Sequence, residues 1–243
     1  MQWSDEGVIL SVKPHGETAA VAEIFTRAHG RHLGLVHGGR SRKLRPVLQI
    51  GNHVDAVWKA RLSEHLGHVA VELRKGYAAQ AMEDALPLAG LSSLCTLARL
   101  LPERDPHPSL YEVTLFVLGY LDDPDVWPAL MVRWELALLD ELGFGLDLSA
   151  CAATGANDNL IYVSPKTGRA VSAAAGEPYK ERLLRLPPFL AKGRQGAATP
   201  EDVLAGLELT GHFLEARVLG PRGDKMPDAR LRLRDLLAKR LPS

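Results

Sequence analysis

The chain has 243 residues, of which 46% are apolar and 24% charged, and it contains two cysteines. This length suits one large or two small domains, and the apolar share is sufficient for a hydrophobic core. Two cysteines cannot form a disulfide framework, no charged-then-apolar leader opens the chain, and no run approaches the roughly 18 apolar residues that span a bilayer. We therefore expect no membrane partner and a reducing compartment such as the cytoplasm.

The net charge is zero, but the charge is unevenly distributed. Residues 1–80 carry 11 basic and seven acidic side chains, residues 81–180 carry six and 14, and residues 181–243 carry 12 and eight. The three balances are +4, −8 and +4, and seven of the nine histidines lie in the first segment. A polyanion responds to the local field rather than to the total charge, so a nucleic-acid partner is compatible with this composition.

The first segment has the pattern of short strands. Apolar runs with a period of two, separated by glycine-containing breaks, predict strands at about 8–13, 18–27, 31–37, 47–61 and 68–74. The residues expected inside are Val54, Ala56 and Trp58 of the fourth strand and Val69, Val71 and Leu73 of the fifth. Five strands followed by helix favour an oligonucleotide-binding (OB) barrel, with a twisted five-strand meander as the alternative.

The segment Gly38–Pro46, called the basic loop below, has four bases within six residues beside two glycines. These residues predict a flexible, exposed cation cluster, whose natural partner is a phosphate backbone. The alternative is a solvated loop without a partner. With further bases on the outside of the barrel, the DNA-binding residues that we predict are Arg27, Arg31, Arg40, Arg42, Lys43, Arg45, Lys59, Arg61 and Arg74.

The histidines raise the alternative of a metal site. His65 and His68 are three residues apart, but they fall at a loop–strand junction, where side chains at this spacing point to opposite sides. No cysteine and no carboxylate at a fixed offset accompanies them. Histidines at the surface or rim of the barrel are therefore the expectation.

After Gly76 the apolar period becomes helical. Helices are expected at about 91–101, 108–121, 128–142, 200–219 and 228–240, with Thr199 as the cap of the fourth. Cys95 lies in the apolar stripe of the first of these helices and is expected to be buried. The third is apolar over most of its circumference, which predicts a central position in a helical bundle.

Residues 151–179 interrupt the helical pattern. Two short strands, at 159–163 and 169–172, flank the turn sequence Ser164–Gly168 and predict a small hairpin insert. A zinc knuckle would need four soft ligands, and only Cys151 is present. The sequence therefore predicts an α+β protein of two domains: a five-stranded OB-type barrel over residues 1–78, and an α-helical bundle over 79–243 interrupted by a hairpin without zinc.

Several motifs together resemble the bacterial recombination and repair mediator family RecO. They are residues 6–10 (EGVIL), 25–31 (FTRAHGR), the basic loop, and residues 135–139 (ELALL) leading to 142–148 (LGFGLDL). The resemblance covers essentially the whole chain. Some members of this family carry four cysteines in the hairpin, and the matching positions in this chain are Cys151, Thr154, Ser172 and Ala175. Three of the four ligands are absent, so no metal or other cofactor is expected.

The resemblance implies a DNA-repair factor without enzymatic activity. Such a protein binds single- and double-stranded DNA, anneals complementary strands and contacts the acidic C-terminal tail of single-strand-binding protein. With RecR, and in some pathways RecF, it helps load RecA onto coated single strands in the cytoplasm, at the nucleoid. The chain has no GxxxxGK[ST] phosphate loop, consistent with a non-enzyme. A second basic patch is expected at Arg217, Arg222, Lys225 and Arg230.

Three other functions are compatible with parts of the sequence. A basic barrel also fits an RNA-binding, translation-associated OB protein. A hydrolase could use a carboxylate such as Asp140, Glu141 or Asp147, although no histidine or glycine loop accompanies them. A scaffold could bind a basic protein through the acidic middle of the chain.

Overall fold

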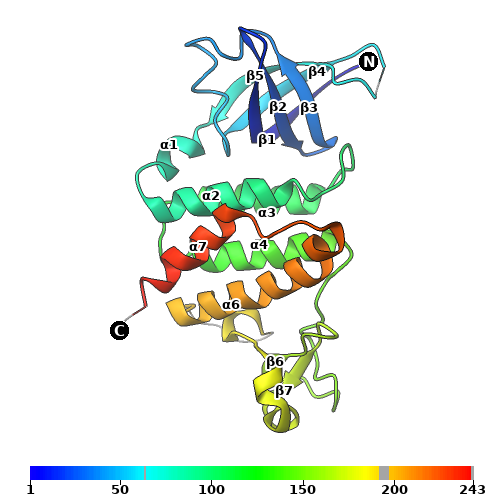
Figure 1. Cartoon of the computed structure of the whole chain (residues 1–243), viewed down its shortest axis with the longest axis vertical. Coiled ribbons are helices and arrows are strands. Elements are labelled where there is room, and N and C mark those ends of the chain that lie inside the picture. The colour runs from blue at the N-terminus through cyan, green and yellow to red at the C-terminus, as the bar shows by residue number, and fades with distance from the viewer. Residues whose placement is uncertain (63, 192–196, 242–243) are drawn as a thin grey trace. The chain divides into compact units, whose positions relative to one another are not determined.

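The computed structural model describes residues 1–62, 64–191 and 197–241. Within these ranges the chain forms two compact units, Met1–Asp122 and Asp123–Ser243 (Figure 1). The first unit holds the strands of a barrel and three helices, and the second holds the remaining helices and a small sheet. The predicted α+β fold class is confirmed. The predicted domain boundary between residues 78 and 79 stays a prediction.

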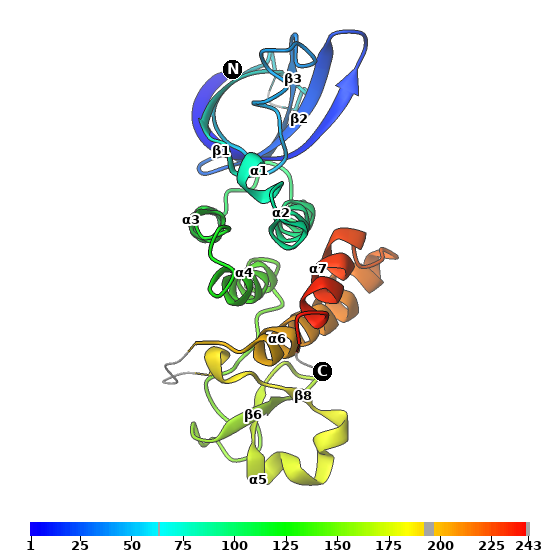
Figure 2. The ribbon, with the colours of Figure 1, turned by 90° about the vertical axis from the view of Figure 1, so that its left-hand side faces the viewer.

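The first unit is built on a five-stranded barrel. Its strands are β1 (Gln2–His15), β2 (Ala19–Thr26), β3 (Gly30–Val36), β4 (His53–Lys59) and β5 (His68–Lys75). They are ordered β1-β2-β3-β5-β4, and β4 pairs back with β1, so the strands trace a ring (Figure 2). A meander would place β4 beside β3, so this order excludes it and is that of an OB barrel.

The barrel closes through its weakest pairing, the seam between β3 and β5. The other strand pairs are antiparallel over seven or more residues, whereas β3 and β5 share one parallel pair, Leu35 with His68. The amide of Leu35 donates to the carbonyl of Gly67 at 3.0 Å beside this pair. Among the described residues, β3 and β5 therefore pair with each other at this position alone.

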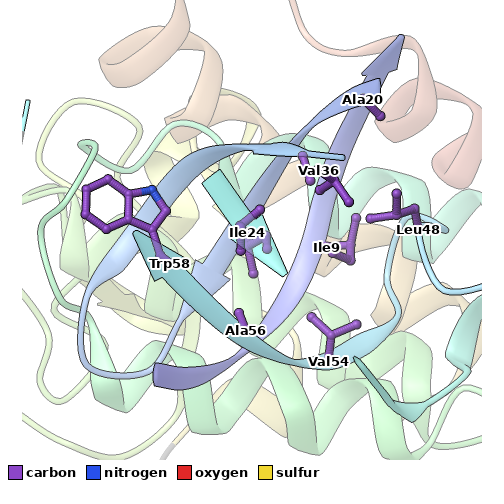
Figure 3. Packing of buried hydrophobic residues seen from close by; sticks show 10 residues of the cluster. Ile9, Ala20, Ile24, Val36, Leu48, Val54, Ala56 and Trp58 are labelled. Atoms are coloured by element: carbon purple, nitrogen blue, oxygen red, sulfur yellow. The ribbon is translucent and has the colours of Figure 1, made fainter. Parts of the chain in front are cut away.

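Alternating apolar residues fill the barrel. Ile9, Ile24 and Val54 converge between the strands, and Leu48 enters from the segment after the basic loop (Figure 3). Trp58 is buried as predicted, and its indole N–H donates to the carbonyls of Leu33 and Leu66 at 3.2 and 3.1 Å. These bonds satisfy the only polar group of a large buried ring.

Two expectations for the barrel are wrong. The fourth strand begins at His53 rather than near residue 47, because the preceding residues form turns held by the buried amide of Asn52, which donates to the carbonyls of Pro46 and Val47 at 3.0 and 3.1 Å. Leu73 was expected inside but is 41% exposed. Among the described residues, β5 pairs with β3 only at the first residue of β5, His68. The far end of β5 therefore has a neighbouring strand, β4, on one side alone.

Three helices complete the first unit: α1 (Tyr77–Ala81), α2 (Ala85–Ala98) and α3 (Pro108–Gly119). Asp84 caps α2 by accepting from the amide of Leu86 at 2.9 Å. Cys95 is buried as expected, and its thiol donates to the carbonyl of Ile9 in β1 at 3.8 Å. Helix α2 therefore lies directly against the barrel wall.

The second unit confirms the predicted hairpin within a helical domain. Its elements are α4 (Trp127–Glu141), β6 (Leu160–Val163), β7 (Ala170–Ser172), α5 (Ala173–Gly176), β8 (Leu184–Arg185), α6 (Pro200–Phe213) and α7 (Asp228–Ala238), with short 3₁₀ turns at Glu177–Arg182, Pro188–Leu190 and Gly220–Arg222. Strand β8 adds a third strand to the hairpin. Helix α6 begins at the predicted Thr199 cap, packs on α4, and continues as a π-helical stretch, Leu214–Leu219.

Over the part of the chain that the structure describes, the helices are too short or too polar to cross a bilayer.

Candidate nucleic-acid interface

The structure divides the predicted basic residues of the barrel into two groups. The first group is engaged in ion pairs. Arg31 is the clearest case, since its guanidinium pairs with Glu23 and donates from Nε to the carbonyl of Leu101 at 3.0 Å. Its side chain is only 14% exposed. Arg31 was predicted as a DNA contact, but its position is that of a structural residue joining β3 to the segment after α2.

Glu23 is the centre of this buried cluster. Burial raises the pKa of Glu23, but hydrogen bonds from Arg31, Ser11 and Arg99 outweigh that effect, so its pKa lies below the ordinary value. Arg99, at the end of α2, donates from Nε at 2.7 Å. The carboxylate therefore stays charged and engages two guanidinium groups.

Arg27 and Arg74 are also paired, although their side chains are about half exposed. Arg27 lies 2.8 Å from Glu112 and 3.5 Å from Glu6. Arg74 pairs with Glu6 and approaches Asp55 to 3.0 Å. The charge of each guanidinium is compensated locally, so these two predicted contacts add little to the field that a phosphate would meet.

The second group consists of exposed cations that have no acidic partner among the described residues. These are Arg42, Lys43 and Arg45 of the basic loop with Lys59 and Arg61 at the end of β4. Arg40 donates to the carbonyls of Gly16 and Glu17 at 3.1 and 2.8 Å, which orients its guanidinium without neutralising it. Charge density in the sequence located this group but could not separate it from the paired one.

Lys13, near the end of β1, is a further exposed cation that the site prediction did not include, and its register partner is Val21. Its neighbours Val12 and Pro14 line the same hollow as Arg40. Because successive side chains of a strand point to opposite faces, Lys13 faces away from that hollow and is not part of this group.

The basic loop is a series of turns rather than an open strand. The amide of Ser41 donates to the carbonyl of Gly38 at 2.8 Å, that of Arg45 to Ser41 at 3.0 Å, and that of Leu48 to Leu44 at 2.9 Å. Leu48 is 5% exposed and anchors the end of this segment in the core. The expected flexible loop is thus tied to the barrel at successive positions, and its cations project from a hydrogen-bonded frame.

Two hollows flank the basic loop. The first, of about 410 Å³, is lined by Val12, Pro14, Ala20, Arg40, Arg45 and Leu48. The second, which we call the seam hollow, has a volume of about 350 Å³ and is lined by residues that include His37, Leu44, Val57, Lys59, His68 and Val71. The basic loop contributes to the walls of both, so its cations lie between two partly apolar depressions.

One of the four residues of the second predicted basic patch is buried. Arg230 is 2% exposed, and its Nε donates to the carboxylate of Glu135 at 2.5 Å. Its inclusion in a surface patch was wrong, because helix α7 turns it inward. Arg217 donates to the carbonyl of Lys166 at 3.1 Å and lies over the ring of Phe213. Arg222 and Lys225 are exposed.

The four positions that match the zinc ligands of the family carry one thiol, two hydroxyls and one methyl group. Cys151 is buried, and its sulfur accepts from the amide of Ser172 at 3.3 Å. The hydroxyls of Ser172 and Thr154 also bond to it, and Ala175 offers only a methyl group. One thiol and two hydroxyls do not fit a zinc site. Over the described residues, no three His, Cys, Asp or Glu side chains gather as metal ligands. This holds for the histidines of the barrel as well.

The hydrogen bonds from these two hydroxyls give the thiol of Cys151 an unusual pKa. Burial raises the pKa of Cys151, but hydrogen bonds from Ser172, Thr154 and nearby amides lower it to about 6. This value lies below the ordinary 9.0, so the thiolate contributes stability that is fully present above pH 9.0 and is lost as the pH falls towards 6. Burial instead raises the pKa of Cys95 to about 12.

We expect Ser172→Ala to raise the pKa of Cys151, because it removes the serine hydroxyl that donates to the thiolate while the amide of residue 172 still donates. The pH dependence of thiolate absorbance, measured in a Cys95→Ala background, checks this. Thr167→Ala, at an exposed position of the hairpin turn, is the control and should leave the titration unchanged. A titration near pH 9 in the unmutated hairpin would contradict the assignment.

Two family models match this chain and define the class of protein to which it belongs. Residues 1–77 match the family model described as Recombination protein O N terminal, and residues 82–226 match the model described as Recombination protein O C terminal. Both matches identify the chain, with its basic OB barrel and its helical domain with a hairpin insert, as a bacterial-type recombination protein.

The relatives specify the family. The chain is 60% identical to DNA repair protein RecO of Methylobacterium nodulans over 95% of both chains. It is 57% identical to DNA repair protein RecO of Methylorubrum populi, over 96% of both chains. For the same protein of Rhodospirillum centenum the identity is 54%, over 98% of this chain and 96% of the relative. The chain belongs to the RecO family of DNA repair proteins.

Proposed function

We propose that this chain is a non-enzymatic mediator of recombinational repair that binds single- and double-stranded DNA through its barrel, anneals complementary strands and helps load RecA onto strands coated with single-strand-binding protein. The observation that supports it most directly is the group of exposed cations that have no acidic partner in the described part of the chain: Arg42, Lys43, Arg45, Lys59 and Arg61. Such a group binds phosphates irrespective of base sequence, as annealing of arbitrary complements requires.

The ion-paired bases support the same assignment by contrast. Glu6, Glu23 and Glu112 neutralise Arg27, Arg31 and Arg74 elsewhere on the barrel. The uncompensated positive field therefore lies on the part of the barrel that carries the basic loop and the end of β4. We accordingly assign the DNA interface to Arg40, Arg42, Lys43, Arg45, Lys59 and Arg61.

The partners that we propose are RecR, the acidic C-terminal tail of single-strand-binding protein and, in some pathways, RecF, with the protein acting in the cytoplasm at the nucleoid. An acidic tail requires uncompensated bases outside the DNA interface. Lys225, exposed in the second unit, is the residue of the second basic patch that meets this requirement best. Arg217 is engaged with the hairpin turn.

The test is a titration of fluorescent single-stranded DNA across salt concentrations, with and without single-strand-binding protein, alongside RNA of the same sequence. We expect DNA affinity to fall steeply with salt and complementary strands to anneal faster in the presence of the protein. A clear preference for RNA would favour the translation-associated alternative. Absence of binding to either strand at low salt would overturn the proposal and favour a scaffold.

A further inference from the structure

We propose that the seam hollow is a nucleobase subsite, into which a base of a bound single strand turns while its flanking phosphates contact the basic loop and Lys59. This inference rests on the proposed function and adds a specific site to it. The occupant is an unpaired base, because a base that is paired in a duplex stays stacked inside the double helix.

The shape of the hollow supports an aromatic, planar occupant. It lies where β3 and β5 separate after their single pair at Leu35 and His68. Its volume of about 350 Å³ is within the range of small-molecule sites. Leu44 and Val71, both partly buried, line it and also pack against the barrel core. A base would cover apolar surface that the short seam leaves partly open.

The polar side of the hollow supplies a stacking surface. His37 and His68 lie face to face, with ring centroids 4.6 Å apart and planes 20° apart. Both line the hollow, and His68 is exposed. Base stacking on an aromatic ring is worth about 1–3 kcal/mol and tolerates any base. A stacking platform of this kind suits a protein that binds strands without reading their sequence.

The surrounding charge fits a nucleotide rather than an uncharged ligand. Lys59 lines the hollow, and Lys43 and Arg45 flank Leu44 of its wall in the chain. None of these three cations has an acidic partner within the described ranges. A strand whose phosphates follow the basic loop towards Lys59 therefore passes the mouth of the hollow, and one base can leave the strand there without breaking the phosphate contacts.

The test compares two fluorescent strands with the same number of phosphates, an oligothymidylate and its abasic counterpart. We expect the full-length protein to bind the oligothymidylate at least about tenfold more tightly. Ala70→Trp places a bulky ring at an exposed position that lines the hollow and should reduce this ratio to about one. Ala28→Trp, at an exposed turn beside the ion-paired Arg27, is the matched control and should keep it.

A second variant makes the test independent of the folding of Ala70→Trp. His68→Ser keeps the backbone pair of the seam and removes half of the stacked histidine pair, so the ratio should fall to about threefold. A ratio of one in the unmutated protein, or a ratio unchanged in His68→Ser, would overturn the subsite while leaving DNA binding intact. Failure of the proposed function differs, since neither strand would then bind.

Discussion

Replacing Arg40, Arg42, Lys43 and Arg45 together with alanine is expected to weaken single-stranded DNA binding by roughly 100- to 1,000-fold at about 0.1 M salt. Each lost phosphate contact removes about 0.7 from the slope of log affinity against log salt, so four remove about 3. The fold should survive, because Leu44 and Leu48 still anchor the loop in the core. Fluorescence anisotropy titrations across salt concentrations measure both quantities.

A matched pair of double variants isolates the location of the charge from its amount. Arg42→Ala with Lys43→Ala removes two uncompensated cations, whereas Arg27→Ala with Arg74→Ala removes two that are paired with Glu6, Glu112 and Asp55. We expect only the first to lower the salt slope, by about 1.4. Equal losses in both would mean that the barrel acts through its total charge, and the assignment to the basic loop would be wrong.

Arg230→Ala is expected to destabilise the second unit by about 3–5 kcal/mol, because it leaves the carboxylate of Glu135 buried without its partner. Glu135 is fully buried, receives the guanidinium at 2.5 Å and also accepts from the hydroxyl of Thr210. The network joins α4, α6 and α7. Urea unfolding followed by circular dichroism measures the loss in the full chain.

Two further variants separate burial from charge at this site. Arg234→Ala on the same helix removes an exposed guanidinium that pairs with the neighbouring Asp235, so stability should change by less than about 0.5 kcal/mol. Glu135→Leu combined with Arg230→Met should recover most of the stability lost in Arg230→Ala. If Arg230→Ala instead left stability unchanged and weakened DNA or partner binding, Arg230 would belong to the surface patch after all.

Local patterns in the sequence were sufficient to predict most of the elements. The period of two placed Val54, Ala56 and Trp58 inside the barrel, and the Thr199 cap located the start of α6. These features depend on residues close together in the chain. The Asn52 turn was missed, although it is local, because side-chain bonds to carbonyls five and six residues earlier leave no periodic pattern in the sequence. Leu73 was misplaced because its exposure depends on where β5 parts from β3.

The sequence alone determined an α+β chain with a dense cluster of bases in the basic loop, and the resemblance of its motifs to the RecO family was enough to assign it. Only the tertiary structure decided which bases are available. Arg31 and Arg230 carry the same charge as Arg42, yet each is held by a carboxylate on another element: Glu23 lies on the neighbouring strand, eight residues away, and Glu135 lies on α4, 95 residues away. Ion pairs form between groups that folding brings within a few ångströms, and composition cannot record that distance.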